Sequence, residues 1–152
     1  MNESERAAAH RVFSGECFNR VWELLEQSNR TAEDNEQMLL AAMASLWHWT
    51  QRADCTAQNR SVGCWQVSRV YALLGQAENA QRFGDEALKY SRGLAPFFAA
   101  YAHEALARAA MVAGDKPLLD AHYSAASKLA ESVTDAEERR MLDDDLAQLR
   151  LP

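Results

Sequence analysis

The sequence has few of the residues that break a chain or crosslink it. Its 152 residues include six glycines, three prolines and no isoleucine. Glycine and proline are common in the turns of all-β proteins and in disordered segments, so their scarcity argues against both classes. Cysteine occurs three times, at Cys17, Cys55 and Cys64, without any Cys-x-x-Cys pair. An odd, unpaired set argues against a disulfide framework and a zinc knuckle, and we expect free thiols in a cytoplasmic protein.

Clustered basic charge and long apolar runs are also missing. The 16 lysines and arginines are outnumbered by 22 acidic residues, which gives a formal net charge of −6. We therefore expect no binding to nucleic acid or to anionic membrane surfaces, because both depend on clustered basic residues. The longest apolar stretch, residues 38–47, is far shorter than the about 20 residues that a membrane-spanning helix needs.

The apolar residues instead recur with the period of an α-helix, as at Phe18, Val21, Trp22 and Leu25. Alternating strand patterns are absent, and the abundant residues are strong helix formers such as alanine, leucine and glutamate. Turn and capping residues divide the chain into about seven helices. Their expected ranges are 5–28 with a break at Ser14-Gly15, 33–52, 59–74, 77–91, 96–114, 116–132 and 135–149.

Short signals mark several of these helix ends. Thr31 with Asp34, and Thr134 with Glu137, have the spacing of N-terminal capping boxes. Gly75 and Gly114 suit the left-handed position that follows a helix. The two glycines are 39 residues apart, and the helix pairs around them can be aligned as two copies of one repeat. The small residues expected to let helices approach closely are Ala80, Ala87, Ala107 and Ala126, and the large ones expected to fill gaps are Tyr71 and Tyr123.

This pattern resembles the tetratricopeptide repeat, a helix–turn–helix unit of about 34 residues. Matching residues are Tyr71, Ala80 and Ala87 in the first copy, and Leu106, Ala107, Tyr123 and Ala126 in the second. Cys64 and His103 depart from the pattern because tryptophan is usual there. The resemblance implies one all-α domain over 1–152, a right-handed α-α superhelix of about three antiparallel helix pairs and a capping helix. The pairs would be 1–52, 59–92 and 96–132, and the capping helix 134–150.

The resemblance also implies a concave groove that binds a protein or peptide segment without catalysis or a cofactor. The positions that face the ligand in that family correspond here to Trp65, Arg69, Tyr101, Glu104, Arg108 and Met111. An arginine there would bind a partner carboxylate. Reversing Arg69 and Arg108 to glutamate is then expected to abolish binding and to spare the fold. In the alternative interpretation, Trp65 is ordinary core and Glu104–Arg108 an exposed ion pair.

Two other functions stay open. A short helical stack leaves apolar ends, so a homodimer through Leu94, Phe97 and Phe98 is one alternative. The other is a small-molecule binder or enzyme whose pocket contains His48, Trp49, Trp65 and His103, with His48 as a titratable group.

Catalytic motifs are missing from the sequence. It contains no nucleophile elbow, P-loop or dinucleotide fingerprint. His103-Glu104 lacks the second histidine of a zinc protease motif, because residue 107 is alanine. We therefore expect no catalytic residues and no metal. Asp143-Asp144-Asp145 is expected to form a solvated acidic face, since three consecutive residues of a helix point in different directions.

Overall fold

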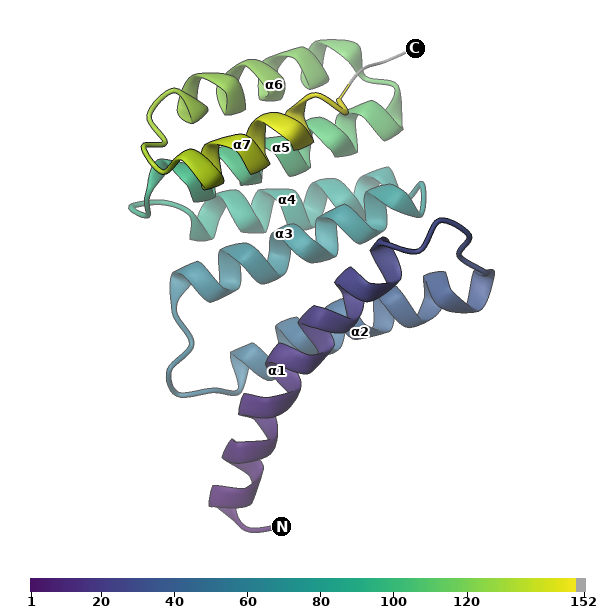
Figure 1. Cartoon of the computed structure of the whole chain (residues 1–152), viewed down its shortest axis with the longest axis vertical. Helices are drawn as coiled ribbons and strands as arrows, with labels where there is room; N and C mark the ends of the chain where they lie inside the picture. Colours follow the sequence, from purple (N-terminus) through teal and green to yellow (C-terminus); the bar gives the residue numbers. More distant parts are fainter. Residues whose placement is uncertain (150–152) are drawn as a thin grey trace.

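The computed structural model describes residues 1–149, which form seven α-helices and no strand. The helices are α1 (Glu3–Leu25), α2 (Ala32–Thr50), α3 (Ala57–Leu73), α4 (Ala77–Tyr90), α5 (Pro96–Ala113), α6 (Lys116–Ala130) and α7 (Ala136–Leu146). The pairs α1–α2, α3–α4 and α5–α6 follow one another along the molecule, and α7 packs against α5 and α6 (Figure 1). The predicted all-α fold, a stack of helix pairs in an α-α superhelical arrangement, is confirmed.

Two predictions, a break within the first helix and the N-cap of the last, differ from the structure, and several helix ends differ by two or three residues. Helix α1 continues through Ser14-Gly15, because Ser14 is buried against α2, where its carbonyl accepts a hydrogen bond from Ser45 Oγ at 2.8 Å. This packing outweighs the weak helix propensity of glycine. The N-cap of α7 is Asp135 rather than Thr134, and its carboxylate accepts from two backbone N–H groups of the first turn. The predicted capping box at Thr31 is confirmed.

The turns at Gly75 and Gly114 have the same geometry. Both glycines adopt the left-handed conformation, with φ of 74° and 71°. In each turn the N–H of the residue after glycine donates to the carbonyl five residues earlier, at 2.9 Å. This pattern closes the C-terminal end of a helix and satisfies carbonyls that would otherwise lack partners. The two turns are therefore equivalent elements, as the sequence alignment predicts.

Small residues lie where the paired helices meet. The four alanines predicted for this role are all fully buried: Ala80, Ala87, Ala107 and Ala126. Tyr71 packs on Phe83 of α4 with ring centroids 5.7 Å apart, as expected of a gap-filling residue. The same prediction for Tyr123 is wrong, since this side chain is 40% exposed. Helix α6 belongs to the last helix pair, so within residues 1–149 no further pair packs over Tyr123.

The buried residues form one large cluster around α5, a second between α1, α2 and α3, and a small third cluster where α3, α4 and α5 meet. Helix α5 is central because it packs against α3, α4, α6 and α7. None of the helices within residues 1–149 combines the length and apolarity needed to cross a bilayer.

Equivalent turns predict equal effects of equivalent substitutions. Gly75→Ala and Gly114→Ala should each lower the free energy of unfolding by about 1 kcal/mol, because a Cβ disfavours the left-handed conformation. Gly15→Ala is the matched control in mid-helix, where an added Cβ meets no atom within 4 Å. It should raise stability by about 0.5–1 kcal/mol. Urea denaturation measures all three, and unequal losses at the two turns would show that they are not equivalent.

Candidate functional site

Helices α1, α3, α5 and α7 contribute side chains to one face of the stack, which we call the inner face. Gln66 of α3 donates to the carbonyl of Phe18 of α1 at 3.1 Å, which fixes these two helices relative to each other. A row of five aromatic rings crosses this face, with neighbouring centroids 5.0–6.2 Å apart. The rings, in order from α1 through α3 to α5, are Phe18, Trp22, Trp65, Tyr101 and Phe97.

A buried carboxylate anchors the centre of the inner face. Glu104 of α5 is 0% exposed. One of its oxygens accepts from Trp65 Nε1 at 3.0 Å, and the other accepts from Arg108 Nε at 2.8 Å. Trp65 and Glu104 are 39 residues apart, as are Arg69 and Arg108, so each pair occupies one position of the internal repeat. A buried charge is tolerated only when it is paired and hydrogen-bonded, as it is here.

The network also includes a second carboxylate, from α7. Asp145 accepts from Arg69 at 2.9 Å and from the Tyr101 hydroxyl at 3.0 Å. Arg69 also lies 3.7 Å from the Glu104 carboxylate. Burial raises the pKa of Tyr101, and the nearby Asp145 charge raises it further, so the phenol stays protonated and acts as a donor. Two arginines and two carboxylates thus form a charge-balanced cluster that ties α7 to α3 and α5.

All six predicted groove residues lie on the inner face, but Glu104, Tyr101 and Trp65 are buried there, at 0%, 8% and 9% exposed. The alternative that Trp65 belongs to the core is therefore correct, and Glu104 is not accessible to a ligand. Met111 lines a cavity beside the charged cluster, and the other five take part in it. The alternative that Glu104 and Arg108 form only an exposed pair is wrong, because Glu104 is fully buried. The side chains of Arg69 and Arg108 are 16% and 13% exposed and already bound to carboxylates of the same chain. Their reversal to glutamate would place four acidic groups together, so we now expect it to unfold the protein.

Sequence reasoning missed Asp145. It grouped this residue with Asp143 and Asp144 as a solvated face, and those two are indeed exposed. Asp145, however, is on the side of α7 that carries the buried Leu142 and Leu146. Spacing alone gives no signal for this, because Asp143 is equally close to the two leucines and is exposed. Only the packing of α7 against α5 and α6 decides which flank of the stripe is covered.

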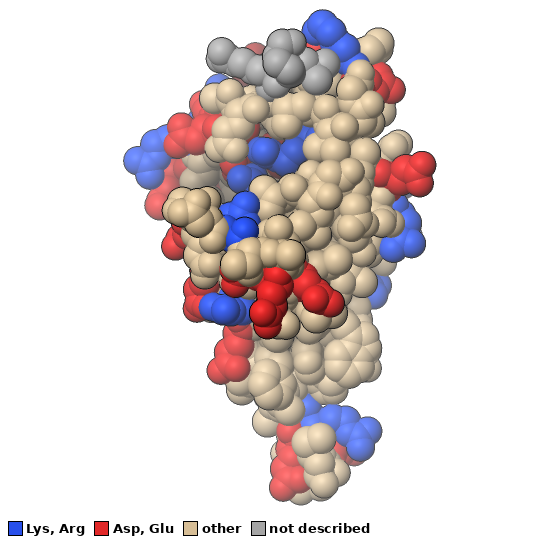
Figure 2. All heavy atoms as spheres, turned by 90° about the vertical axis from the view of Figure 1, so that its right-hand side faces the viewer, with Lys and Arg blue, Asp and Glu red and all other residues tan. Residues whose placement is uncertain are grey.

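Two cavities open on the inner face on either side of Trp22. The first, of about 330 Å³, is lined mainly by aromatic and other apolar side chains, with Met141 and Asp145 of α7 at its wall. The second, of about 460 Å³, lies beside Arg69, Arg108 and Met111. Together they follow α3 from Ser61 to Leu73, about 18 Å at 1.5 Å per residue. We call this combined feature the inner groove. Figure 2, turned to the right-hand side of Figure 1, shows basic atoms set within a recess.

The proposed dimer patch lies beside the first cavity. Phe97 and Phe98 line it, and Phe97 also packs on Tyr101 with centroids 5.0 Å apart. Leu94, in the loop before α5, is half-buried. Phe97 and Phe98 therefore belong partly to the inner face.

The residues of the alternative pocket lie in separate settings. His48 pairs with His10 of α1, with the two Nδ1 atoms 2.8 Å apart. His103 pairs with His122 of α6, with the two Nδ1 atoms 3.0 Å apart. Trp49 lies in another cavity, of about 230 Å³, beneath the guanidinium of Arg52. Trp65 belongs to the inner face, so the structure does not assemble these four side chains around one ligand.

The two histidine pairs were not foreseen, because each joins residues far apart in the sequence. Across residues 1–149, no group of three or more His, Cys, Asp or Glu side chains is placed to hold a metal ion. Each pair needs one ring nitrogen to donate and the other to accept, so both rings cannot be protonated without losing the hydrogen bond.

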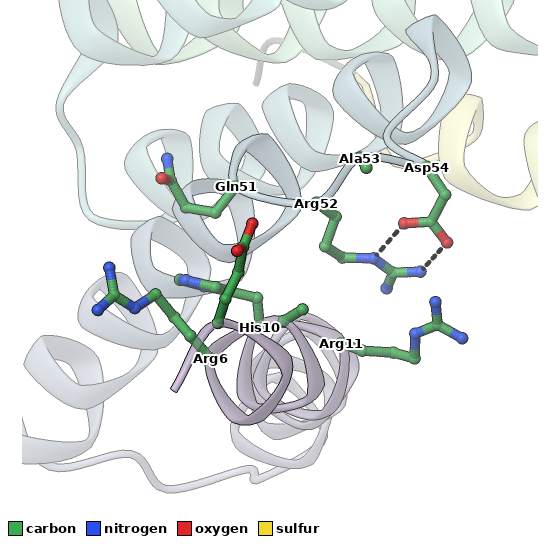
Figure 3. Close-up of a pocket in the computed structure, with 9 residues that line it drawn as sticks. Arg6, His10, Arg11, Gln51, Arg52, Ala53 and Asp54 are labelled. Carbon is green, nitrogen blue, oxygen red and sulfur yellow. Dashed lines mark hydrogen bonds and ion pairs between the residues drawn. The ribbon is translucent and has the colours of Figure 1, made fainter. Parts of the chain in front are cut away.

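An open cleft of about 610 Å³ lies between the start of α1 and the loop after α2. Arg52 donates to both carboxylate oxygens of Asp54, at 2.9 and 2.7 Å (Figure 3). This hydrogen bonding lowers the pKa of Asp54 to about 2. Arg52 also donates to Ser14 Oγ at 2.8 Å. These hydrogen bonds connect the loop after α2 to α1, and each of the three guanidinium nitrogens of Arg52 donates one of them.

Comparison of the chain with protein-family models, with curated proteins and with solved structures found no match. The tetratricopeptide resemblance therefore stays a prediction.

The buried cluster predicts a large difference between two identical substitutions. Glu104→Gln removes the charge that Arg108 and Arg69 share, and should lower the free energy of unfolding by about 3 kcal/mol. Glu86→Gln is the control, because Glu86 forms an exposed pair with Lys89 and should change stability by no more than about 0.5 kcal/mol. Chemical denaturation measures both, and equal effects would contradict the role of the Glu104 charge.

The histidine pairs predict loss of stability in mild acid. Burial lowers the pKa of His48, His103 and His122, and for His48 and His103 the neighbouring histidine lowers it further. Asp85 opposes the shift at His122. The folded chain thus binds fewer protons than the unfolded chain, in which the pKa is about 6.5. Stability is complete above that pH and declines as the pH falls through the lower folded values.

The melting temperature should therefore fall between about pH 7.5 and pH 5, before most carboxylates titrate. His122→Gln should reduce this dependence, because one of the three shifted groups is then absent and His103 loses its imidazole neighbour. Calorimetry over this range measures the slope. A slope that is the same in the variant would show that the His103–His122 pair is not responsible.

Proposed function

We propose that the chain is a non-catalytic interaction module whose inner groove binds an apolar segment of a partner protein. The observation that carries the proposal is the first cavity, which is lined by aromatic side chains from α1, α3 and α5 together with Met141 of α7. Concave, mostly apolar sites with a few polar groups are typical of binding sites in proteins. A large apolar anchor that fills such a hollow supplies much of the energy of an interface.

The length of the groove suggests the form of the partner segment. The two cavities follow about 18 Å of α3, between α1 on one side and α5 and α7 on the other. A helix of about twelve residues has this length. An amphipathic helix laid in an apolar groove is a recurrent mode of peptide recognition, in which side chains three and four residues apart act as anchors.

The charged cluster gives a further expectation for the partner. Arg69 and Arg108 line the second cavity, but Glu104 and Asp145 already balance their charge. Binding should thus depend mainly on apolar burial and respond weakly to salt, unlike binding to an unpaired basic patch. The arginines would orient polar groups of the segment through remaining N–H donors.

A small apolar molecule is the second candidate ligand. The first cavity, of about 330 Å³, is within the size range of small-molecule sites. Such a ligand would fill this cavity alone, whereas a partner helix would also cover the second cavity. The two candidates thus differ in whether substitutions near Met111 affect binding.

The proposal places the protein in the cytoplasm, where cysteine thiols stay reduced. All three cysteines are free. Burial raises the pKa of the Cys64 thiol to about 12, and burial also raises that of Cys17. Thiols with raised pKa values are poor nucleophiles, which supports a structural rather than a catalytic role for them.

Selection of a displayed random-peptide library on the full chain tests the function. We expect enriched peptides with large apolar residues at helical spacing. Met141→Glu places a charge at the cavity wall on a side chain that is 49% exposed, so it should weaken the selected peptides at least about tenfold and leave the melting temperature unchanged. Tyr123→Glu, 40% exposed on α6, is the control and should bind normally.

The proposal fails if no peptide is enriched, or if Met141→Glu and Tyr123→Glu bind the selected peptides equally well. Peptide binding that Met111→Glu leaves unchanged would favour the small-molecule alternative, because the second cavity would then be unused.

A further inference from the structure

The first cavity of the inner groove is lined mainly by aromatic rings. Six of its ten lining residues are aromatic, and they belong to α1, α3 and α5. They are Phe18, Trp22, Trp65, Phe97, Phe98 and Tyr101. Four neighbouring pairs of rings have interplanar angles of 67–85°, so these pairs are steeply inclined rather than stacked. The wall of the cavity therefore consists largely of π-electron surface with several orientations.

This cavity also has a charge of one sign. Among the described residues that line it, Asp145 of α7 alone is charged. Arg69 and Arg108 line the second cavity instead, and Glu104 is fully buried. The charged cluster is thus balanced as a whole, but a carboxylate lies at the first cavity and the guanidinium groups lie at the second. A cation in the first cavity is favoured over an anion.

The hydrogen bonds around the cavity limit the kind of cation. The two oxygens of Asp145 already accept from Arg69 at 2.9 Å and from the Tyr101 hydroxyl at 3.0 Å. The Ser61 hydroxyl donates to the carbonyl of Ala87 at 3.0 Å. A primary ammonium has three N–H donors, and burial among rings would remove their water partners without replacement. A quaternary ammonium has no N–H group and loses no hydrogen bond there.

A neutral apolar group would suit the rings but not the carboxylate. The side chain of Asp145 is 19% exposed, and an occupant of the cavity would displace water from it. Lost hydration of a charge costs free energy unless an opposite charge replaces it. A trimethylammonium group combines both requirements, because its methyl groups pack on the rings while its positive charge is attracted to their faces and to the carboxylate.

From these observations we propose that the first cavity binds a trimethylammonium group, carried by a trimethylated lysine of the partner segment. This inference rests on the proposed function and names the anchor of that segment. The groove continues past Trp22 to the second cavity, so residues that flank the lysine would lie there. A free quaternary ammonium compound would fill the first cavity alone.

Two small molecules of equal shape test the charge. Choline and 3,3-dimethylbutan-1-ol differ only in a quaternary nitrogen or carbon, and magnetic resonance titration of the full chain at constant ionic strength follows the indole N–H signals of its four tryptophans. Choline should shift the signals of Trp22 and Trp65 and bind at least about fivefold tighter than the alcohol. Trp47, 54% exposed on α2, is the internal control and should not shift.

Substitutions in the cavity wall should affect the two molecules differently. Met141→Glu adds a negative charge, so it should tighten choline at least about threefold and weaken the alcohol. Phe98→Leu keeps an apolar wall without a π face, so it should weaken choline about fivefold and spare the alcohol. Phe13→Leu, 45% exposed on α1, is the matched control and should change neither. Melting temperatures show whether each variant is folded.

Peptides with a fixed trimethyllysine and random flanking residues test the partner segment. The best of them should bind at least about tenfold tighter than choline, because flanking residues add contacts in the second cavity. Met111→Glu should remove that gain. The same peptides with unmodified lysine should bind at least about tenfold more weakly, since a buried ammonium would lack hydrogen-bond partners.

Equal binding of choline and the neutral alcohol overturns the proposal, and so does a choline affinity that Met141→Glu lowers. Apolar peptides selected from the unmodified library would then still support the groove, so failure of this inference differs from failure of the proposed function. If choline binds as expected but no trimethyllysine peptide binds tighter than choline, the assignment to a partner segment is wrong and the ligand is a free quaternary ammonium compound.

Discussion

The buried carboxylate of Glu104 is the interaction on which the inner face depends. A charge at 0% exposure needs donors from its surroundings, and Trp65 of α3 and Arg108 of α5 supply them. Because the donors belong to successive helix pairs, this requirement holds the pairs in one register. Apolar packing alone tolerates small displacements of one helix along another, whereas a hydrogen bond of 3.0 Å does not.

The charged groups around Glu104 also fix the position of α7. Glu104 carries one negative charge and has two arginines near it, so a second carboxylate balances the cluster. Asp145 provides it, and Leu142 and Leu146 beside it fill the apolar space between α5 and α6. The last helix is thus fixed by one polar and two apolar contacts. It forms a wall of the first cavity, so the shape of the inner groove depends on the charge balance beneath it.

Much of the architecture was accessible from local sequence signals. The seven helices follow from apolar periodicity and from capping residues such as Thr31, and the equivalent turns follow from Gly75 and Gly114 at matched positions. Alanines at the helix contacts were predicted because only small residues permit close approach. One error arose at Ser14-Gly15, where packing against α2 outweighed weak helix propensity, and another where two adjacent capping residues competed, since Asp135 caps α7 in place of Thr134.

Local sequence signals are enough to specify the helices, their turns and the small residues at the helix contacts, because each depends on neighbours within a few positions. They do not specify which charges meet. Arg69 and Asp145 are 76 residues apart, and His103 and His122 belong to different helices, so nothing local indicates these contacts. In the sequence Arg69 and Arg108 look available to a ligand, but in the folded chain they pair with the carboxylates of Asp145 and Glu104. The physical reason is that an ion pair depends on the final positions of its helices in space, which periodicity along one helix does not specify.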